Sequence, residues 1–115
     1  MTLEQLKDSP FDKIIKGDSR VQVLFEDERV IAFPSKNPCA NIHFIVLAKS
    51  LQHHSMADVD VESEQDEALL GHMMVVAAQL AQSMNIPNGY RIVSNSGKNA
   101  FQTIHNLYLH VIGGQ

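Results

Sequence analysis

The fold is decided by the last eleven residues, which read His105-Asn106-Leu107-Tyr108-Leu109-His110-Val111-Ile112-Gly113-Gly114-Gln115. Their alternation of polar and apolar residues predicts a strand over 104–112 that is followed by a glycine turn. Because successive side chains of a strand point to opposite faces, Asn106, Tyr108 and His110 are expected to share one face. The other face is apolar. The stretch therefore predicts a sheet with a core on one side and polar or titratable groups on the other.

The rest of the chain predicts four further strands and two helices. The strands are expected over 21–25, 29–33, 43–47 and 90–94, and a short helix over 11–17. The clearest helix covers 63–84, where Ser63 and Asp66 form a weaker variant of the capping box. Its core stripe at helical spacing comprises Leu69, Met73, Val76, Ala77, Leu80 and Met84. Strands before and after one long helix indicate an α+β fold with a mostly antiparallel sheet.

Length and composition are those of an ordinary globular domain. The 115 residues are 44% apolar and 19% charged, with a formal net charge of −4 at pH 7, which suits one domain with a real core. The lack of a basic stretch argues against a nucleic-acid partner. No apolar run approaches the ~20 residues that span a bilayer, and the polar first ten residues lack a signal core. The single Cys39 fits a reducing compartment. We therefore expect a cytoplasmic or nuclear protein without membrane contact.

Several stretches along the chain resemble the histidine triad (HIT) family. They are Phe11-Asp12-Lys13-Ile14-Ile15, Phe25-Glu26-Asp27-Glu28, His43-Phe44, Leu69-Leu70-Gly71-His72, Gly89-Tyr90-Arg91 and Val111-Ile112-Gly113-Gly114. Each is weak alone, but their order and spacing are specific. They are most similar to the branch called histidine triad nucleotide-binding proteins. The resemblance covers residues 10–115, the expected HIT domain, and leaves residues 1–9 as an N-terminal extension.

The resemblance implies a fold, an assembly and an activity. The fold is a five-stranded antiparallel sheet with one long and one short helix. The assembly is a homodimer whose two sheets join edge to edge. The activity is hydrolysis of purine nucleoside phosphoramidates or aminoacyl adenylates, with no metal and no other cofactor. In the family a histidine attacks the α-phosphorus, and water then cleaves the nucleotidyl-histidine.

The family signature has three alternating histidines, and this chain keeps only the third. His110 matches it, whereas Asn106 stands at the first position and Tyr108 at the central, nucleophilic one. An asparagine cannot relay a proton, and a phenol with a pKa of ~10 is only about 0.1% ionised at pH 7. His43 matches a fourth histidine behind the triad. The resemblance therefore implies an impaired catalytic centre, in which Tyr108 fills the nucleophile's place or, as the weaker alternative, acts as a nucleophile itself.

The nucleotide-binding positions of the family are kept in part. Thr103 and Asn95 match residues that contact phosphate, and Phe33 falls in the nucleotide-binding region. Ser35 stands where the family has a carboxylate that grips the ribose, and Lys36 stands where an apolar residue meets the base. The resemblance therefore implies a polar, anion-accepting corner without the usual ribose contact.

Three functional hypotheses remain open at this point. The first is a catalytically impaired HIT homodimer that binds purine mononucleotides weakly or not at all, with a protein partner that the sequence does not identify. The second is an active nucleoside phosphoramidate hydrolase of reduced rate. The third is a dimeric interaction protein that binds no nucleotide. No spacing of histidines and cysteines indicates a metal site.

Overall fold

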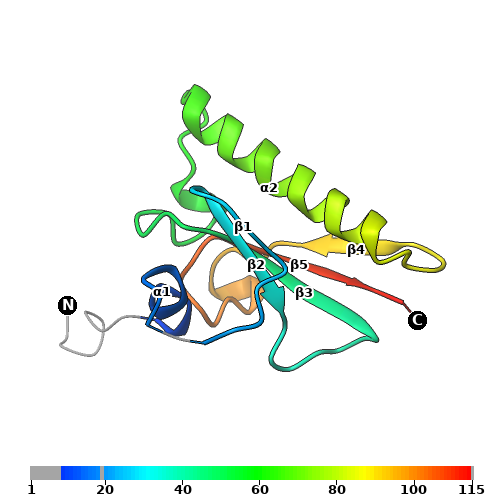
Figure 1. The fold of residues 1–115 in the computed structure, drawn as a ribbon. Helices are drawn as coiled ribbons and strands as arrows, with labels where there is room; N and C mark the ends of the chain where they lie inside the picture. Colours follow the sequence, from blue (N-terminus) through cyan, green and yellow to red (C-terminus); the bar gives the residue numbers. More distant parts are fainter. Residues whose placement is uncertain (1–8, 19, 115) are drawn as a thin grey trace.

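The computed structural model describes residues 9–18 and 20–114 and has an α+β architecture (Figure 1). One sheet contains β1 (Phe25–Glu26), β2 (Val30–Pro34), β3 (Ile42–Ala48), β4 (Tyr90–Val93) and β5 (Tyr108–Gly113). The strand order is β1-β2-β3-β5-β4, and every neighbouring pair is antiparallel. The helices are α1 (Pro10–Ile15), α2 (Glu64–Ser83) and the short 3-10 helices η2 (Met56–Asp58) and η3 (Lys98–Ala100). The predicted five-stranded fold with one long and one short helix is confirmed. Of the predicted extension, residues 1–8 lie outside the described residues.

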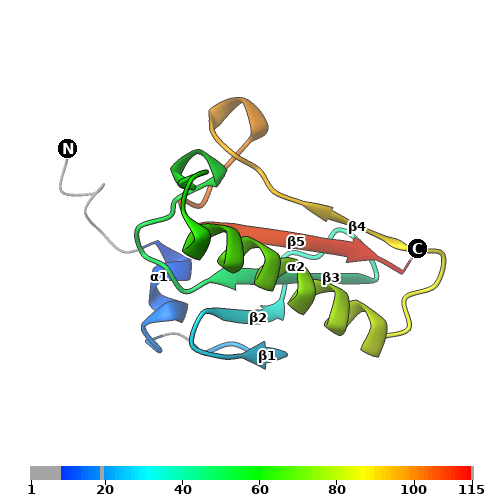
Figure 2. The same ribbon diagram turned by 90° about the horizontal axis from the view of Figure 1, so that it is seen from above.

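The two faces of the sheet carry separate apolar cores. The first core lies under α2, and its buried residues include Val30, Phe44, Val46, Met73, Val76, Ala77, Leu107, Leu109 and Val111. The second core consists of Ile31, Phe33, Ile45 and Leu47, with Phe11, Ile14 and Ile15 of α1 packed against it. Figures 1 and 2 show α2 along one face of the sheet, whereas α1 and η3 lie on the other side. Both faces of β2 and β3 are therefore covered, which explains their nearly continuous burial.

The long helix begins and packs as its sequence predicts. The Ser63 hydroxyl accepts a hydrogen bond from the Asp66 backbone N–H at 3.2 Å, which caps the N-terminus of α2. The predicted stripe faces the first core, where Met73, Val76 and Ala77 are buried. Within the described residues, no helix combines the length and the apolar composition needed to cross a bilayer.

Two predicted strands are three residues shorter in the structure. β5 begins at Tyr108 and not at 104. The Leu107 carbonyl still accepts from the Ala48 N–H at the end of β3 (3.0 Å), but the Leu107 N–H donates to the carbonyl of His53 (3.1 Å). The bond to His53 ties Leu107 to the loop that follows β3, and the residues before Tyr108 do not continue the strand. In the first hairpin only Phe25–Glu26 pair as a strand, and Val21 packs into the second core. In both places tertiary contacts override the local alternation of polar and apolar residues.

Candidate functional site

A pocket of about 690 Å³ lies on the sheet face opposite α2. Its wall includes Pro10, Phe11 and Ile14 of α1 on one side and Phe101 of the η3 loop on another. Of the eight predicted site residues, those that line it are Phe33, Ser35, His43, Asn95, Thr103, Tyr108 and His110. Asn106 is the exception. We call this cavity the main pocket; in Figure 1 it corresponds to the side of the sheet that carries α1 and η3.

The register of the sheet sets the floor of the main pocket. Ile45 of β3 pairs with Phe33 on β2 and with His110 on β5. Side chains of directly paired residues share a face of the sheet. Phe33, Ile45 and His110 are therefore level with one another, with Phe33 and His110 two strand spacings apart, or roughly 10 Å. The floor thus has an aromatic group at one end and a titratable group at the other.

The aromatic end of the pocket depends on α1. The Phe11 ring lies edge-on to Phe33, with centroids 5.5 Å apart, and edge-on to Tyr108, with centroids 4.8 Å apart. Ile14 also lines this wall. The sequence pattern did not identify these α1 residues as site residues. Their apolar spacing in the short helix was the available signal, but it does not say which end of the sheet the helix covers.

The titratable end of the pocket is a pair of histidines with fixed proton positions. The Cys39 backbone N–H donates to His43 Nδ1 at 3.1 Å, so this nitrogen carries no proton. The proton of the neutral ring is then on His43 Nε2, which donates to His110 Nδ1 at 2.9 Å. Neutral His110 consequently carries its own proton on Nε2. The chain of bonds makes His110 a hydrogen-bond donor toward an anion, and it leaves neither His110 nitrogen with a free lone pair for nucleophilic attack.

Burial lowers the pKa of both histidines. For His110 the main cause is desolvation, followed by repulsion from a charged His43, and for His43 the cause is desolvation. The unfolded chain, with ordinary histidine pKa values of ~6.5, therefore binds more protons than the folded protein near pH 6. Above pH ~6.5 both histidines are neutral in the folded and the unfolded chain, and the pair does not lower the free energy of unfolding. As the pH falls through ~6.5, the unfolded chain takes up protons first, and the free energy of unfolding decreases.

We expect the free energy of unfolding to decrease when the pH is lowered from 8 to 5.5, and the decrease to be smaller in the double variant His43→Asn/His110→Asn. Urea unfolding at several pH values measures both proteins. The ion pairs of His53 with Asp66 and of His72 with Asp27 are present in both, so the difference isolates the pocket histidines. Parallel pH profiles for the two proteins would contradict the prediction.

Tyr108 occupies the position between the aromatic end and the histidine pair. Its ring lies 5.2 Å from the His110 ring, centroid to centroid, and it packs with the second core. Burial raises the pKa of the Tyr108 phenol above its ordinary value. The phenolate is therefore rarer than in a free tyrosine. This disfavours the alternative that Tyr108 acts as the nucleophile.

Asn106 holds α1 in place and does not face the main pocket. The side chain is 2% exposed, and its Nδ2 donates to Asp12 Oδ1 at 2.7 Å. Its Oδ1 accepts from the hydroxyl of Ser9, the N-cap of α1. Ser9 and Asp12 also form a reciprocal capping box. The residue at the first triad position thus fixes the helix whose Phe11 forms the aromatic wall.

We expect Asn106→Ala to lower the free energy of unfolding by about 2–3 kcal/mol. The substitution removes two buried hydrogen bonds, one of them to a carboxylate, and leaves a cavity. Urea unfolding gives the value. Ser9→Ala is the comparison variant: it removes one of the two Asn106 bonds together with the N-cap bond from the Asp12 N–H, and it leaves the bond between Asn106 and Asp12 in place. A loss below about 0.5 kcal/mol for Asn106→Ala would show that α1 does not depend on this contact.

The η3 loop at the edge of the pocket is held by hydrogen bonds from side chains that flank it. Asn95 Nδ2 donates to the Ala100 carbonyl at 2.8 Å, and the Gln102 side chain accepts from the Gly97 N–H at 2.8 Å. Phe101 has a φ of 61°, in the left-handed region that disfavours bulky residues, and it is 85% exposed. Because Asn95 already supports the loop, only part of its amide remains for a ligand.

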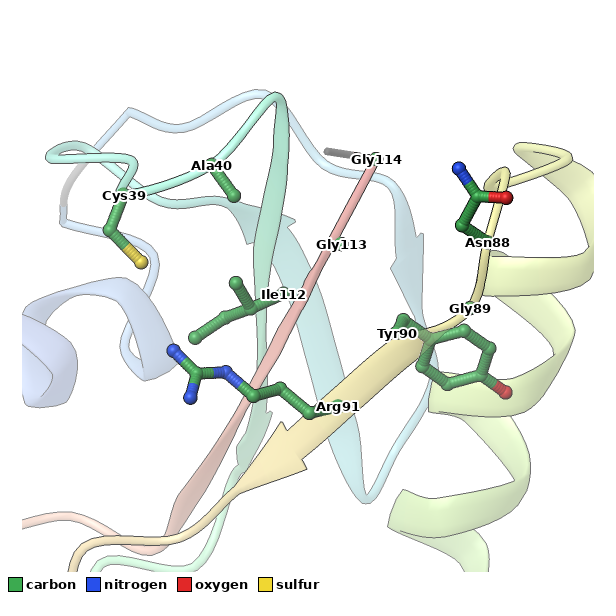
Figure 3. A pocket seen from close by; sticks show the side chains of 9 residues that line it. All are labelled: Cys39, Ala40, Asn88, Gly89, Tyr90, Arg91, Ile112, Gly113 and Gly114. Atoms are coloured by element: carbon green, nitrogen blue, oxygen red, sulfur yellow. The ribbon is translucent and has the colours of Figure 1, made fainter.

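A second hollow of about 420 Å³ lies at the glycine end of β5 (Figure 3). It is lined by Cys39, Ala40, Asn88, Gly89, Tyr90, Arg91, Ile112, Gly113 and Gly114. Figure 3 shows the Arg91 side chain extending across Ile112. Among these residues Arg91 is the only charged group, and none is a predicted site residue. In the part of the chain that the structure describes, no group of three or more His, Cys, Asp or Glu residues could hold a metal ion.

Comparison with known families decides the classification of the chain. The HIT domain matches residues 16–115. The chain belongs to the HIT family. A 14 kDa zinc-binding protein from Zea mays is 34% identical over 115 residues, which cover 98% of this chain and 88% of the relative. The predicted family is therefore confirmed.

Solved HIT structures have the same fold along nearly the whole chain. A HIT family hydrolase from Legionella pneumophila aligns with a TM-score of 0.86 and 30% identity, over 94% of each chain. A histidine triad protein from Clostridium difficile aligns with a TM-score of 0.84 and 26% identity, over 100% of this chain and 94% of that chain. The main pocket therefore lies on a sheet with the HIT fold.

Proposed function

We propose that this HIT protein binds purine mononucleotides weakly in the main pocket and hydrolyses nucleoside phosphoramidates far more slowly than a HIT protein with an intact triad. The observation that carries the proposal is the position of Tyr108. It lines the pocket between Phe11 and His110, where the family resemblance requires a nucleophilic histidine. Family membership and the Legionella relative, a hydrolase by its name, support the general class of activity.

The residues of the pocket suit the parts of a mononucleotide. A purine ring can pack against the aromatic cluster of Phe11 and Phe33, which touch each other edge to face and offer further edge and face contacts. A phosphate fits at the other end, where the Nε2–H of His110 and the Thr103 hydroxyl donate hydrogen bonds. These contacts hold the ligand but supply no attacking lone pair, because His110 uses Nδ1 to accept from His43.

The chemistry of this proposal involves no zinc. The zinc named for the Zea mays relative has no matching ligand set here, because no three His, Cys, Asp or Glu residues gather among the described residues. The kept histidine pair of His43 and His110 supports residual transition-state stabilisation. A slow hydrolase is therefore the second candidate function, since electrostatic groups alone retain part of a rate enhancement when a nucleophile is lost.

We also propose that the chain forms a homodimer. Met74 and Val75 of α2 face away from the first core and are 48% and 52% exposed. Two adjacent large apolar side chains on the outer face of a long helix are typical of a surface that another chain covers. The family resemblance implies a second copy as that chain. If the protein acts through protein partners and not through nucleotides, the same exposed apolar face of α2 is the candidate contact surface.

Calorimetric titration with AMP tests nucleotide binding directly. We expect a dissociation constant of ~0.1 mM or weaker, because Ser35 lacks a carboxylate for the ribose, and charged hydrogen bonds of that kind contribute ~1.5–3 kcal/mol. Phe33→Ala and His110→Ala should each weaken the titration further, whereas Val61→Ala, a change at a 92% exposed side chain, should not. A micromolar constant, or a titration unaffected by the two pocket variants, would contradict this binding mode.

A further inference from the structure

The rim of the main pocket is cationic although the chain as a whole is acidic. Arg20 and Lys36 both line the pocket, and none of its described lining residues is an aspartate or glutamate. The formal net charge of the chain is −4. Both side chains belong to exposed residues, and neither forms an ion pair with a carboxylate elsewhere in the described part of the chain. Two unpaired cations are therefore gathered at one opening, where they attract an anionic ligand.

Lys36 lies on the β2 side of the pocket: it follows Ser35, whose N–H donates to the carbonyl of His43 on β3 at 2.9 Å. Lys36 follows the end of β2, three residues after Phe33. Arg20 precedes Val21, which packs in the second core with Phe33. His110 belongs to β5, and β3 separates it from β2. The pocket consequently has one anion-accepting group at His110 on β5, two strands away from the end of β2 that Lys36 follows. A second is formed by Lys36 and the other cation of the lining, Arg20.

We infer that the ligand of the main pocket is a purine nucleotide with a second phosphate on its ribose, a nucleoside bisphosphate. The inference rests on the proposed nucleotide binding and specifies its substrate class. The 5′-phosphate lies at His110 and Thr103, and the 2′- or 3′-phosphate meets Lys36 and Arg20. Dinucleotide sites show the same chemistry: an acidic residue binds a free ribose hydroxyl, whereas a basic residue accommodates a ribose phosphate.

Ser35 fits this assignment better than a carboxylate would. It lines the pocket directly before Lys36, and a serine hydroxyl can donate to a phosphate oxygen. A carboxylate at this position would repel the phosphate and would pair with Lys36. For AMP as the ligand, Ser35 lacks the carboxylate that binds the ribose, and Lys36 lacks the apolar contact with the base. For a bisphosphate as the ligand, the two residues together form one polar, positively charged corner that binds the second phosphate.

Calorimetric titrations with AMP, adenosine 2′,5′-bisphosphate and adenosine 3′,5′-bisphosphate at low ionic strength test the inference. We expect one of the bisphosphates to bind about 10- to 100-fold more tightly than AMP, as one or two charged hydrogen bonds provide. The variants Lys36→Gln and Arg20→Gln should each reduce this affinity ratio, and the double variant should bring it close to one. Ser35→Asp should lower the ratio as well. Lys13→Gln, at an exposed lysine of α1 that does not line the pocket, is the matched charge control and should keep the ratio.

The possible outcomes separate this inference from the proposed function. If AMP binds and neither bisphosphate binds more tightly, the second phosphate site is refuted while nucleotide binding stands. If the bisphosphate preference persists in the double variant, or if Lys13→Gln removes it equally, the preference does not come from Lys36 and Arg20 and the inference fails. If none of the three nucleotides binds, the proposed function itself is wrong.

Discussion

Replacing Tyr108 by histidine is expected to raise the turnover of adenosine phosphoramidate by about a thousandfold or more. A neutral imidazole at this position supplies the lone pair that the buried phenol lacks, since burial raises the pKa of Tyr108. Loss of a covalent nucleophile typically costs several orders of magnitude in rate, so its return should recover a large part of them. A fluorogenic purine phosphoramidate gives the rate, and mass spectrometry of the quenched enzyme should detect a nucleotidyl adduct in the variant.

The control for this experiment is Tyr108→Phe, which removes the hydroxyl and keeps the ring beside Phe11. Its residual turnover should equal that of the unmodified chain, because the phenol takes no part in the reaction. A large drop in Tyr108→Phe would instead identify Tyr108 as the nucleophile. A folded Tyr108→His protein without any adduct or gain in turnover would show that the rest of the site does not support the reaction.

A charge on the outer face of α2 is expected to dissociate the homodimer. Val75→Asp places a carboxylate among apolar side chains of the proposed interface, where burial of an unpaired charge costs several kcal/mol. Each 1.4 kcal/mol changes the dissociation constant tenfold, so the variant should be monomeric at micromolar concentration. Light scattering should give twice 12.8 kDa for the unmodified chain and 12.8 kDa for the variant.

The matched control is Val61→Asp, the same change at an exposed valine that precedes α2. This protein should remain a dimer. An unmodified chain that is monomeric at micromolar concentration would overturn the proposed assembly, and a dimeric Val75→Asp would place the interface on another surface.

Local patterns in the sequence predicted most of the fold. The alternation through Leu109 and Val111 matched the apolar face of β5, and the helical spacing of Met73, Val76 and Ala77 matched the face of α2 that covers it. The N-cap Ser63 marked the beginning of α2 correctly. These features follow from periodicity and capping, which depend on residues close to each other in the chain.

The features that the sequence did not predict depend on contacts between distant residues. Asn106 bonds to Ser9 and Asp12, which are more than ninety positions away, and no local pattern reveals that pairing. The proton positions of His43 and His110 follow from the register of β3 with β5 and from the Cys39 N–H.

The extent of the site was also fixed by tertiary structure. α1 had to be placed on the sheet before Phe11 could be recognised as a wall of the pocket. The same holds for Arg20, whose position at the rim depends on the packing of its neighbour Val21 in the second core. The family resemblance could align the triad positions, but it could not show which new contacts the replaced residues make.

The most direct test of the impaired catalytic centre is the turnover of the unmodified chain itself. Purified protein is mixed with a fluorogenic adenosine phosphoramidate at saturating concentration, and the initial rate is divided by the concentration of pocket sites. The position of Tyr108 and the protonated Nε2 of His110 predict a turnover several orders of magnitude below 1 per second, the low end of typical enzyme rates. A turnover of about 1 per second or faster, retained through purification and abolished by His110→Ala, would contradict the account.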